Sequence, residues 1–163
     1  MEHTAYTARE IIDLLGMVPH QEGGWYAFVT TSGVTLPDGF LPAFDGARDT
    51  CSIIYYLLQR GEISRWHQLQ ASEVWAWHMG GSLEMTLGGT GERPVPEGKL
   101  CLGPRLRDRD GERPQILARA GQWQTTRLVE GDYALVSCIV APAFRDEDCL
   151  LPSRPLENEI YGE

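Results

Sequence analysis

Positive charge is scarce in this sequence of 163 residues. Lysine and arginine together number 14, against 23 aspartates and glutamates, and the formal net charge is -9. A surface of this charge repels phosphate backbones and anionic lipids. We therefore expect neither a nucleic-acid partner nor binding to a membrane surface.

Long apolar runs are also missing. The longest, around residues 133–144, is too short to span a bilayer and carries polar residues. No cationic stretch followed by an apolar core stands at the start of the sequence, so no signal peptide is predicted. We therefore expect a cytoplasmic protein.

Paired cysteines are absent. The chain has four scattered cysteines, with no C-x-x-C spacing: Cys51, Cys101, Cys138 and Cys149. This pattern predicts neither a cysteine zinc site nor a disulfide framework, and it favours free, mostly buried thiols in a reducing compartment.

Three common catalytic motifs are missing as well. The sequence contains no G-x-S-x-G elbow, no Walker phosphate loop and no G-x-G-x-x-G segment after a strand. It therefore gives no signal for an elbow-type serine hydrolase or for these two modes of nucleotide binding.

What the sequence does contain is one short helix and many short strands. Thr7 and Glu10 form a capping box and Gly16 suits a helix end, which predicts a helix over about residues 7–16. After Pro19, short apolar or alternating runs recur between Gly, Pro and Asp clusters, as strands do. The predicted strands cover residues 25–31, 51–58, 63–69, 73–79, 82–87, 100–102, 115–118, 122–128 and 133–140.

This series of strands predicts an all-β fold. A closed or double-sheet antiparallel barrel suits it, because such barrels leave few strand edges exposed. No linker divides the chain, so we predict one domain over residues 1–163, with the barrel over about 19–145 and a terminal segment over 146–163.

The candidate site lies in the stretch GEISRWHQLQASEVWAWHMGG, residues 61–81. Side chains alternate along a strand, so residues two apart share a face. The residues that share a face are Arg65, His67 and Leu69 on the first strand and Glu73, Trp75 and Trp77 on the second. If both faces line the barrel, His67 and Glu73 converge beside the tryptophans.

The spacing in this stretch resembles the first signature of the cupin superfamily, at Gly61, His67, Glu73 and Gly80. That signature has a second histidine where this chain has Leu69. In the second signature, P-x-G-x-x-H-x-x-x-N, Gly121 matches the glycine and Gln124 replaces the histidine. Of the four metal-binding positions of metallocupins, the chain keeps His67 and Glu73.

Further motifs make the resemblance more specific. In chain order they read PHQEGGW, IYYLL, SRWH, EVW, PQ, GQWQ and GDYALV. Over about residues 17–151 the chain is similar to the branch called cupin family five, whose members are small single-domain cupins. The resemblance implies a jelly-roll barrel, or double-stranded β-helix, that is usually dimeric and has a ligand cavity of the dTDP-sugar epimerase type. It assigns no substrate.

Metal binding and acid–base chemistry are the two alternatives for the site. Catalytic transition-metal sites usually use three protein ligands, of which His67 and Glu73 supply two and Gln124 only a neutral amide oxygen. We therefore expect no cofactor and keep a divalent metal on these three residues as the lesser alternative. Acid–base chemistry needs only a histidine with a suitable pKa and a carboxylate.

The resemblance to epimerase-type cupins makes His67 the candidate base and Glu73 its partner. Trp75 and Trp77 would form an apolar wall, and Arg65 would hold a substrate anion by bidentate hydrogen bonds. The further candidate ligand-binding residues are Gln124, His20, Glu22, Tyr26 and Tyr55.

Other readings of these residues stay open. His20 and Glu22 either form a polar pair at the cavity rim or only stabilise a turn before Gly23 and Gly24. His67 and Glu73 themselves could simply satisfy each other inside the barrel. His78 has the opposite parity and is predicted at the surface or at an interface.

Three functions follow from these alternatives. The leading hypothesis is a metal-independent isomerase or epimerase that acts on a sugar-like, carbonyl or carboxylate metabolite through His67 and Glu73. The second is a barrel that binds a metabolite without catalysis, and the third is a metallocupin oxygenase or lyase. All three imply a small-molecule ligand, and the family resemblance adds a homodimer.

Overall fold

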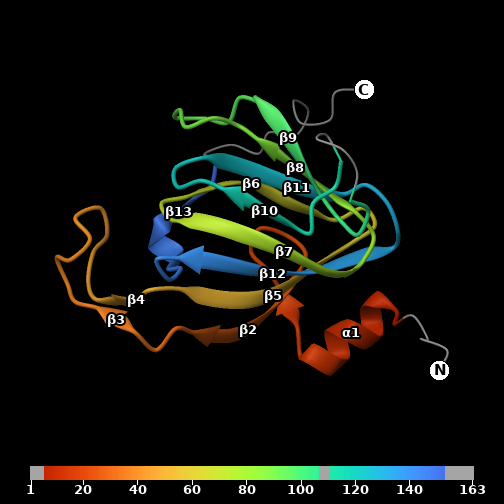
Figure 1. The fold of residues 1–163 in the computed structure, drawn as a ribbon, viewed down its shortest axis with the longest axis horizontal. Helices are drawn as coiled ribbons and strands as arrows, with labels where there is room; N and C mark the ends of the chain where they lie inside the picture. The colour runs from red at the N-terminus through yellow and green to blue at the C-terminus, as the bar shows by residue number, and fades with distance from the viewer. Residues whose placement is uncertain (1–5, 107–110, 153–163) are drawn as a thin grey trace.

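The computed structural model describes residues 6–106 and 111–152, in which one α-helix precedes a series of antiparallel strands (Figure 1). The elements are α1 (Ala8–Leu15), β1 (Val18–Pro19), β2 (Trp25–Thr31), β3 (Thr35–Leu36), β4 (Arg48–Asp49), β5 (Ser52–Gln59), β6 (Ile63–Leu69), β7 (Ser72–Gly80), β8 (Leu83–Leu87), β9 (Gly98–Leu102), β10 (Gln115–Ala118), β11 (Trp123–Leu128), β12 (Tyr133–Ala141), the 3-10 turn η1 (Asp146–Asp148) and β13 (Cys149–Leu150). No helix in these two ranges is long and apolar enough to cross a membrane.

The helix α1 forms where its capping signals predict it. The Thr7 hydroxyl accepts from the backbone N–H of Glu10, whose carboxylate accepts from the backbone N–H of Thr7. Gly16, at a φ of 61°, ends the helix in the left-handed conformation that glycine adopts without strain. Ile11 and Ile12 are buried in a small cluster with side chains of β5 and β12.

Two antiparallel sheets form the barrel. The strand order is β1-β2-β5-β12-β7-β10 in one sheet and β13-β6-β11-β8-β9 in the other, while β3 and β4 pair separately. Because β12 lies between β5 and β7, strands that are distant in sequence are neighbours in space. This is the jelly roll, or double-stranded β-helix, and the predicted all-β fold with a short N-terminal helix is confirmed.

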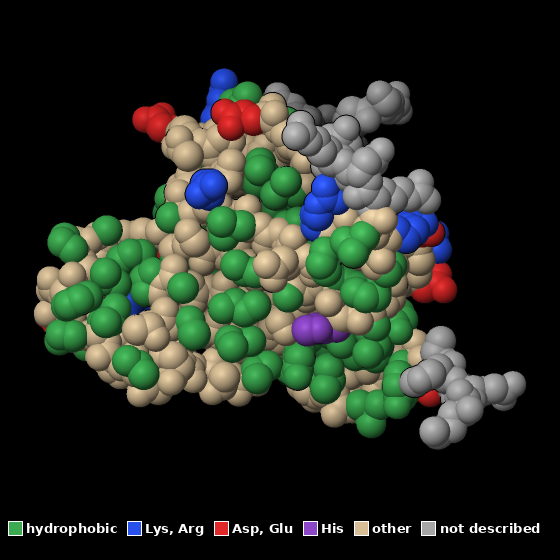
Figure 2. Space-filling model, viewed as in Figure 1, with side chains coloured by type: hydrophobic (Ala, Val, Ile, Leu, Met, Phe, Trp, Pro, Cys, Tyr) green, Lys and Arg blue, Asp and Glu red, His purple; other side chains and the backbone are tan. Residues whose placement is uncertain are grey.

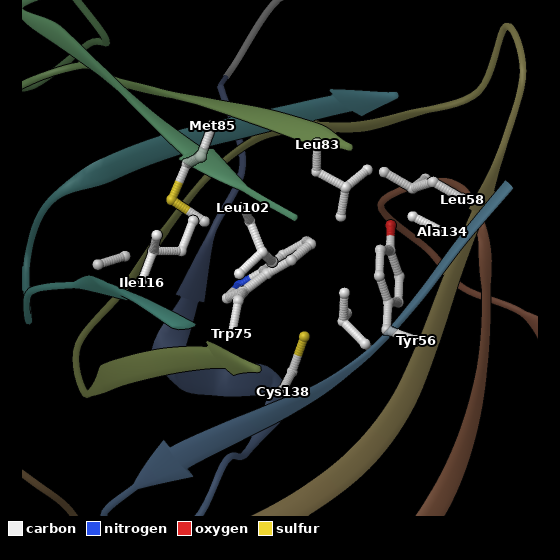
Figure 3. Close-up of a cluster of buried hydrophobic side chains, with 11 residues drawn as sticks. Tyr56, Leu58, Trp75, Leu83, Met85, Leu102, Ile116, Ala134 and Cys138 are labelled. Carbon is white, nitrogen blue, oxygen red and sulfur yellow. The ribbon is translucent and has the colours of Figure 1, made fainter. Parts of the chain in front are cut away.

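The interior of the barrel has a filled end and a hollow end. At the filled end, apolar side chains of both sheets pack together, among them Leu58, Leu83 and Leu102, which are fully buried (Figure 3). Tyr56, Trp75 and Cys138 belong to this cluster and also line a cavity at the other end. The core is therefore the floor of the cavity.

The pair β3 and β4 lies beyond the hollow end. Hydrophobic side chains are gathered over this part of the surface, as Figure 2 shows in the same view as Figure 1. Val34 and Phe40 are exposed there, and Phe28 of β2 is 64% exposed although it also lines the cavity. The hollow end thus has an apolar rim.

Candidate functional site

The cavity at the hollow end has a volume of about 490 Å³. Its polar and charged lining includes His20, Glu22, His67, Glu73 and Asp146, and its aromatic lining is Tyr26, Phe28, Tyr56, Trp75 and Phe144. A volume of this size suits a small metabolite.

A bulge in β6 aims His67 into the barrel. Gln124 of β11 pairs with His67 and Thr126 pairs with Ser64, so two residues of β6 lie opposite one residue of β11. The extra residue shifts the alternation of side chains. Ser64 and His67, three positions apart, are therefore both buried, while Arg65 between them is exposed.

His67 lies between two carboxylates. Its Nδ1 is 2.7 Å from the carbonyl oxygen of Arg65 and 3.5 Å from Oε2 of Glu22, and its Nε2 is 4.0 Å from Oε2 of Glu73. A carbonyl oxygen only accepts, so Nδ1 carries a proton and donates it. The distance from Nε2 to Glu73 exceeds ordinary hydrogen-bond length. A ligand atom can therefore reach Nε2 from the cavity without breaking a bond of ordinary length.

These carboxylates control the protonation of His67. Burial alone lowers the pKa of this histidine, but the negative charges of Glu22 and Glu73 outweigh burial and raise the pKa to about 9. Burial would raise the pKa of Glu73, yet His67 and the amide of Gln124 hold that pKa below its ordinary value. At neutral pH the site therefore holds an imidazolium beside an ionised Glu73.

Gln124 supports Glu73 from behind the cavity wall. Its Nε2 donates to Oε2 of Glu73 at 2.7 Å, and both side chains are buried. The Oε1 of Gln124 is buried and finds no partner within the described residues. The indole N–H of Trp75, also buried, lowers the pKa of Glu73 but makes no hydrogen bond of ordinary geometry.

A tight turn delivers Glu22 to His67. Gly23 has a φ of 104°, and a Cβ there would collide with the backbone oxygen of Ile63, so the turn packs directly on β6. The hydroxyl of Tyr56 donates to the carbonyl oxygen of Gly23 at 2.6 Å. Cys149 of β13 donates to Oε1 of Glu22 at 3.4 Å. The turn thus holds the carboxylate of Glu22 beside His67, which belongs to β6.

The structure brings most of the predicted site residues together. His20, Glu22, Tyr26 and Trp75 line the same cavity as His67 and Glu73. The rings of His20 and Tyr26 meet edge to face with centroids 4.9 Å apart. Burial lowers the pKa of His20, although the charge of Glu22 partly opposes this.

Four predicted ligand-binding residues do not line the cavity, and one of them is Gln124, which lies behind Glu73. The alternation predicted for β6 is wrong at Arg65 because of the bulge, and the exposed guanidinium of Arg65 donates to the carbonyl oxygen of Gln21. Trp77 lies one repeat further towards the filled end, where its indole donates to the Gly81 oxygen at 3.0 Å. Tyr55 is on the outer face, edge to face with His78.

The cavity also contains residues that the sequence did not indicate. Tyr56 lines the cavity where the sequence predicted its neighbour Tyr55, because Tyr56 has the parity that faces the core. Phe144 and Asp146 follow β12 in an irregular segment. Side chains do not alternate regularly there, so the sequence does not predict which of them point into the barrel. Cys138 of β12 lines the cavity floor, and β12 is buried on both faces there, so no alternation of apolar and polar residues indicates which side chains face the cavity.

The donor set does not fit a three-ligand transition-metal site. Leu69 stands on the cavity wall where a further ligand would be needed, and Gln124 offers Glu73 an N–H group. Within residues 6–106 and 111–152, no three His, Cys, Asp or Glu side chains group as metal ligands would. A metal on His67, Glu73 and Gln124 therefore requires a different arrangement of these side chains.

Comparisons with known proteins agree with the fold and the motifs. Residues 9–151 match the family described as Cupin superfamily (DUF985). A crystal structure of a protein from Shewanella oneidensis is similar, with a TM-score of 0.76 at 33% identity over 91% of this chain and 86% of that one. A hypothetical protein from Leishmania major has a TM-score of 0.75 at 26% identity over 90% and 88% of the two chains.

More distant structures share the fold alone. A dTDP sugar isomerase from Desulfovibrio desulfuricans has a TM-score of 0.52 at 13% identity, over 80% of this chain and 82% of that one. No curated protein matches this chain. Because the family match runs through α1 and both sheets of the jelly roll, the chain belongs to the cupin superfamily.

Proposed function

We propose that this cupin is a metal-independent isomerase or epimerase that acts on a small, sugar-sized carbonyl compound. The observation that carries the proposal is the position of His67 between Glu22 and Glu73 on the wall of a cavity of about 490 Å³. The likeness to a dTDP sugar isomerase adds support at the level of the fold only.

His67 is the proposed proton donor. The resemblance to epimerase-type cupins suggested a base, but a pKa of about 9 keeps the imidazole protonated at neutral pH. An imidazolium stabilises the negative charge that develops on a carbonyl oxygen when a neighbouring carbon loses its proton. His67 lines the cavity, its Nδ1 is occupied by the carbonyl oxygen of Arg65, and Nε2 is therefore the atom that would donate.

Glu73 is the proposed proton acceptor. Its carboxylate takes the proton from the carbon beside the carbonyl, the C–H electron pair becomes the C=C bond of an enol, and the carbonyl oxygen takes the proton of His67. If a proton returns to the other face of the same carbon and the enol oxygen gives its proton back to His67, the product is an epimer. If that carbon carries a hydroxyl, a proton can instead return to the former carbonyl carbon while this hydroxyl gives up its own proton and becomes the new carbonyl, and the product is an isomer. Neither outcome needs an oxidant or a reductant.

The surroundings suit this chemistry. Trp75 is 2% exposed and meets Tyr56 edge to face with ring centroids 5.3 Å apart. Such a wall excludes water and lets a sugar ring lie against aromatic faces. His67 and Glu73 are buried in this wall, so their charges act on each other more strongly than they would in water.

Proton exchange in heavy water tests the proposal. Wild-type protein is incubated in D2O with a panel of neutral and amino aldoses and ketoses, and NMR follows the signal of the protons on the carbon beside the carbonyl, which is C2 in aldoses and C1 or C3 in ketoses. We expect wash-out of that proton from at least one compound, loss of exchange in His67→Gln and Glu73→Gln, and retention in His78→Gln. The last variant makes the same change in a histidine on the outer face, where it meets Ser137.

The opposite result favours the second function, binding without catalysis. In that case no panel member exchanges, and native mass spectrometry finds a metabolite retained unchanged. The homodimer that the resemblance implies is also a proposal, and light scattering after size-exclusion chromatography tests it.

A further inference from the structure

The charges that line the cavity are unbalanced. Glu22, Glu73 and Asp146 contribute three carboxylates, and His67 is the one charged partner that lies between two of them. No lysine or arginine of the described chain lines the cavity. Formally, the wall therefore has an excess of negative charge even when His67 is protonated.

The arginines near the mouth have other partners. Arg48 is buried and pairs with Asp148. Arg145 donates to the backbone oxygens of Asp45 and Ala47, and Arg65 donates to that of Gln21. An anionic ligand would consequently meet carboxylates in the cavity and no free cation there to compensate for its lost hydration.

Two of the carboxylates line the cavity together with His20. Glu22 is buried in the wall, where it also lies beside His67, and both Glu22 and Asp146 act electrostatically on His20. Asp146 belongs to η1 and is exposed, so a ligand can reach its carboxylate from solvent. His20 stays neutral because burial lowers its pKa. It does not cancel the negative charge of the rim.

Aromatic faces lie beside these carboxylates. Tyr26 packs against His20, Tyr56 does so on the other side with centroids 5.6 Å apart, and Phe28 is largely exposed at the rim. An aromatic face attracts a cation through its quadrupole, and a nearby carboxylate strengthens that attraction. Aromatic rings combined with carboxylates are the chemistry that recognises alkylammonium groups.

We propose that the ligand of this cavity is an organic cation, with an ammonium group held at the rim by Asp146 and Glu22 and an apolar or sugar-like body against the aromatic wall. As a statement about substrate it rests on the proposed function, and it narrows that function to amino-carbonyl compounds. Carboxylate metabolites and sugar nucleotides are disfavoured as substrates because both bring negative charge into an acidic cavity.

A matched set of probes tests the preference without requiring turnover. Cyclohexylamine, cyclohexanol and cyclohexanecarboxylate have the same ring and differ in charge at pH 7. Their dissociation constants are measured by ligand-observed NMR at low salt with wild-type protein. We expect the amine to bind about tenfold or more tightly than the carboxylate, with the alcohol between them.

Two variants locate the cation. Asp146→Asn should weaken the binding of cyclohexylamine several-fold and leave the affinity for cyclohexanol unchanged. Glu147→Gln removes the same charge from the next residue of η1, which does not line the cavity, and should change neither. An equal loss in both variants would show a diffuse charge effect and would overturn the proposed contact.

Other results overturn the proposal directly. Equal affinity for the three probes, including no measurable binding of any, contradicts a cation site. Preferred binding of the carboxylate that is lost in Arg65→Met would instead identify Arg65 as an anion anchor. In either case, His67-dependent exchange with a neutral sugar would leave the acid–base proposal standing, so the two proposals can fail separately.

Discussion

Nδ1 of His67 lies 3.5 Å from Oε2 of Glu22, although β6 supplies the histidine and the turn before β2 supplies the carboxylate. This contact joins the N-terminal part of the chain to the centre of the barrel. Together with Glu73 on the other side of the ring, it makes the histidine a cation in a buried place.

Replacement of Glu22 by glutamine should lower the pKa of His67 from about 9 towards neutrality. The substitution removes one of the two negative charges that raise this pKa, while burial, which lowers the pKa, is unchanged. The ring-proton shift of His67 in an NMR titration measures this. Asp132→Asn, on an exposed residue paired with Arg60, is the control. An unchanged titration in Glu22→Gln would show that Glu73 alone sets the pKa.

Stability should decline in mildly alkaline solution. The pKa of His67 is about 9 in the folded protein against 6.5 for the free group, so the folded state holds a proton that the unfolded state has lost. The contribution is complete below pH 6.5 and disappears as the pH rises through 9. We expect the free energy of unfolding to fall by up to about 3 kcal/mol across this window. Urea unfolding at a series of pH values measures this decrease, and we expect the decrease to be absent in His67→Gln.

Two substitutions should complete a metal site around His67 and Glu73. Leu69→His together with Gln124→His restores the two histidines of the cupin signatures beside His67 and Glu73. Elemental analysis should then find about one zinc or manganese ion per chain, against much less in the wild type purified in parallel. Stoichiometric metal in the wild type would contradict the metal-independent mechanism.

The hydroxyl of Tyr56 should matter through the turn it anchors. Tyr56→Phe removes the 2.6 Å bond to the carbonyl oxygen of Gly23 and should destabilise the protein by about 1 kcal/mol. Because the turn carries Glu22, the pKa of His67 should fall as well. A loss of stability without any change in that pKa would show that Glu22 is held by other contacts.

Gly23 should tolerate no side chain. Gly23→Ala places a Cβ against the backbone of Ile63 at a φ of 104°, so we expect a loss of about 2 kcal/mol or more in thermal or urea unfolding. Gly33→Ala is the matched control, since its φ is also positive but nothing lies within 4 Å of the added atom. If the two variants lost the same amount of stability, the positive φ alone, and not the collision with Ile63, would explain the effect.

Local patterns predicted the architecture well. The capping box located α1, and alternating apolar residues between Gly and Pro clusters located the longer strands of both sheets. The two-residue strands β1 and β13 were not predicted, and β13 lies within the stretch expected to be a terminal segment. Parity also placed Glu73 and Trp75 inward and His78 outward, because β7 is regular over its first residues. These predictions depend only on the period of the side chains along one strand.

The remaining features depend on contacts between distant segments. The bulge that exposes Arg65 arises where β6 meets β11, and no property of β6 alone indicates it. Trp77 has the predicted parity but lies too far along β7 to reach the hollow end. The pairing of Glu22 with His67 depends on how one turn packs, so the sequence indicated a polar rim and missed the contact.

The filled end of the barrel has a consequence for how specificity can change. Tyr56, Trp75 and Cys138 are shared between core and cavity, so a substitution at the floor alters folding and ligand fit together. Phe28 and Asp146 at the rim contribute little to the core. Substitutions at the rim could therefore change which ligand fits the cavity while the core and His67 stay the same.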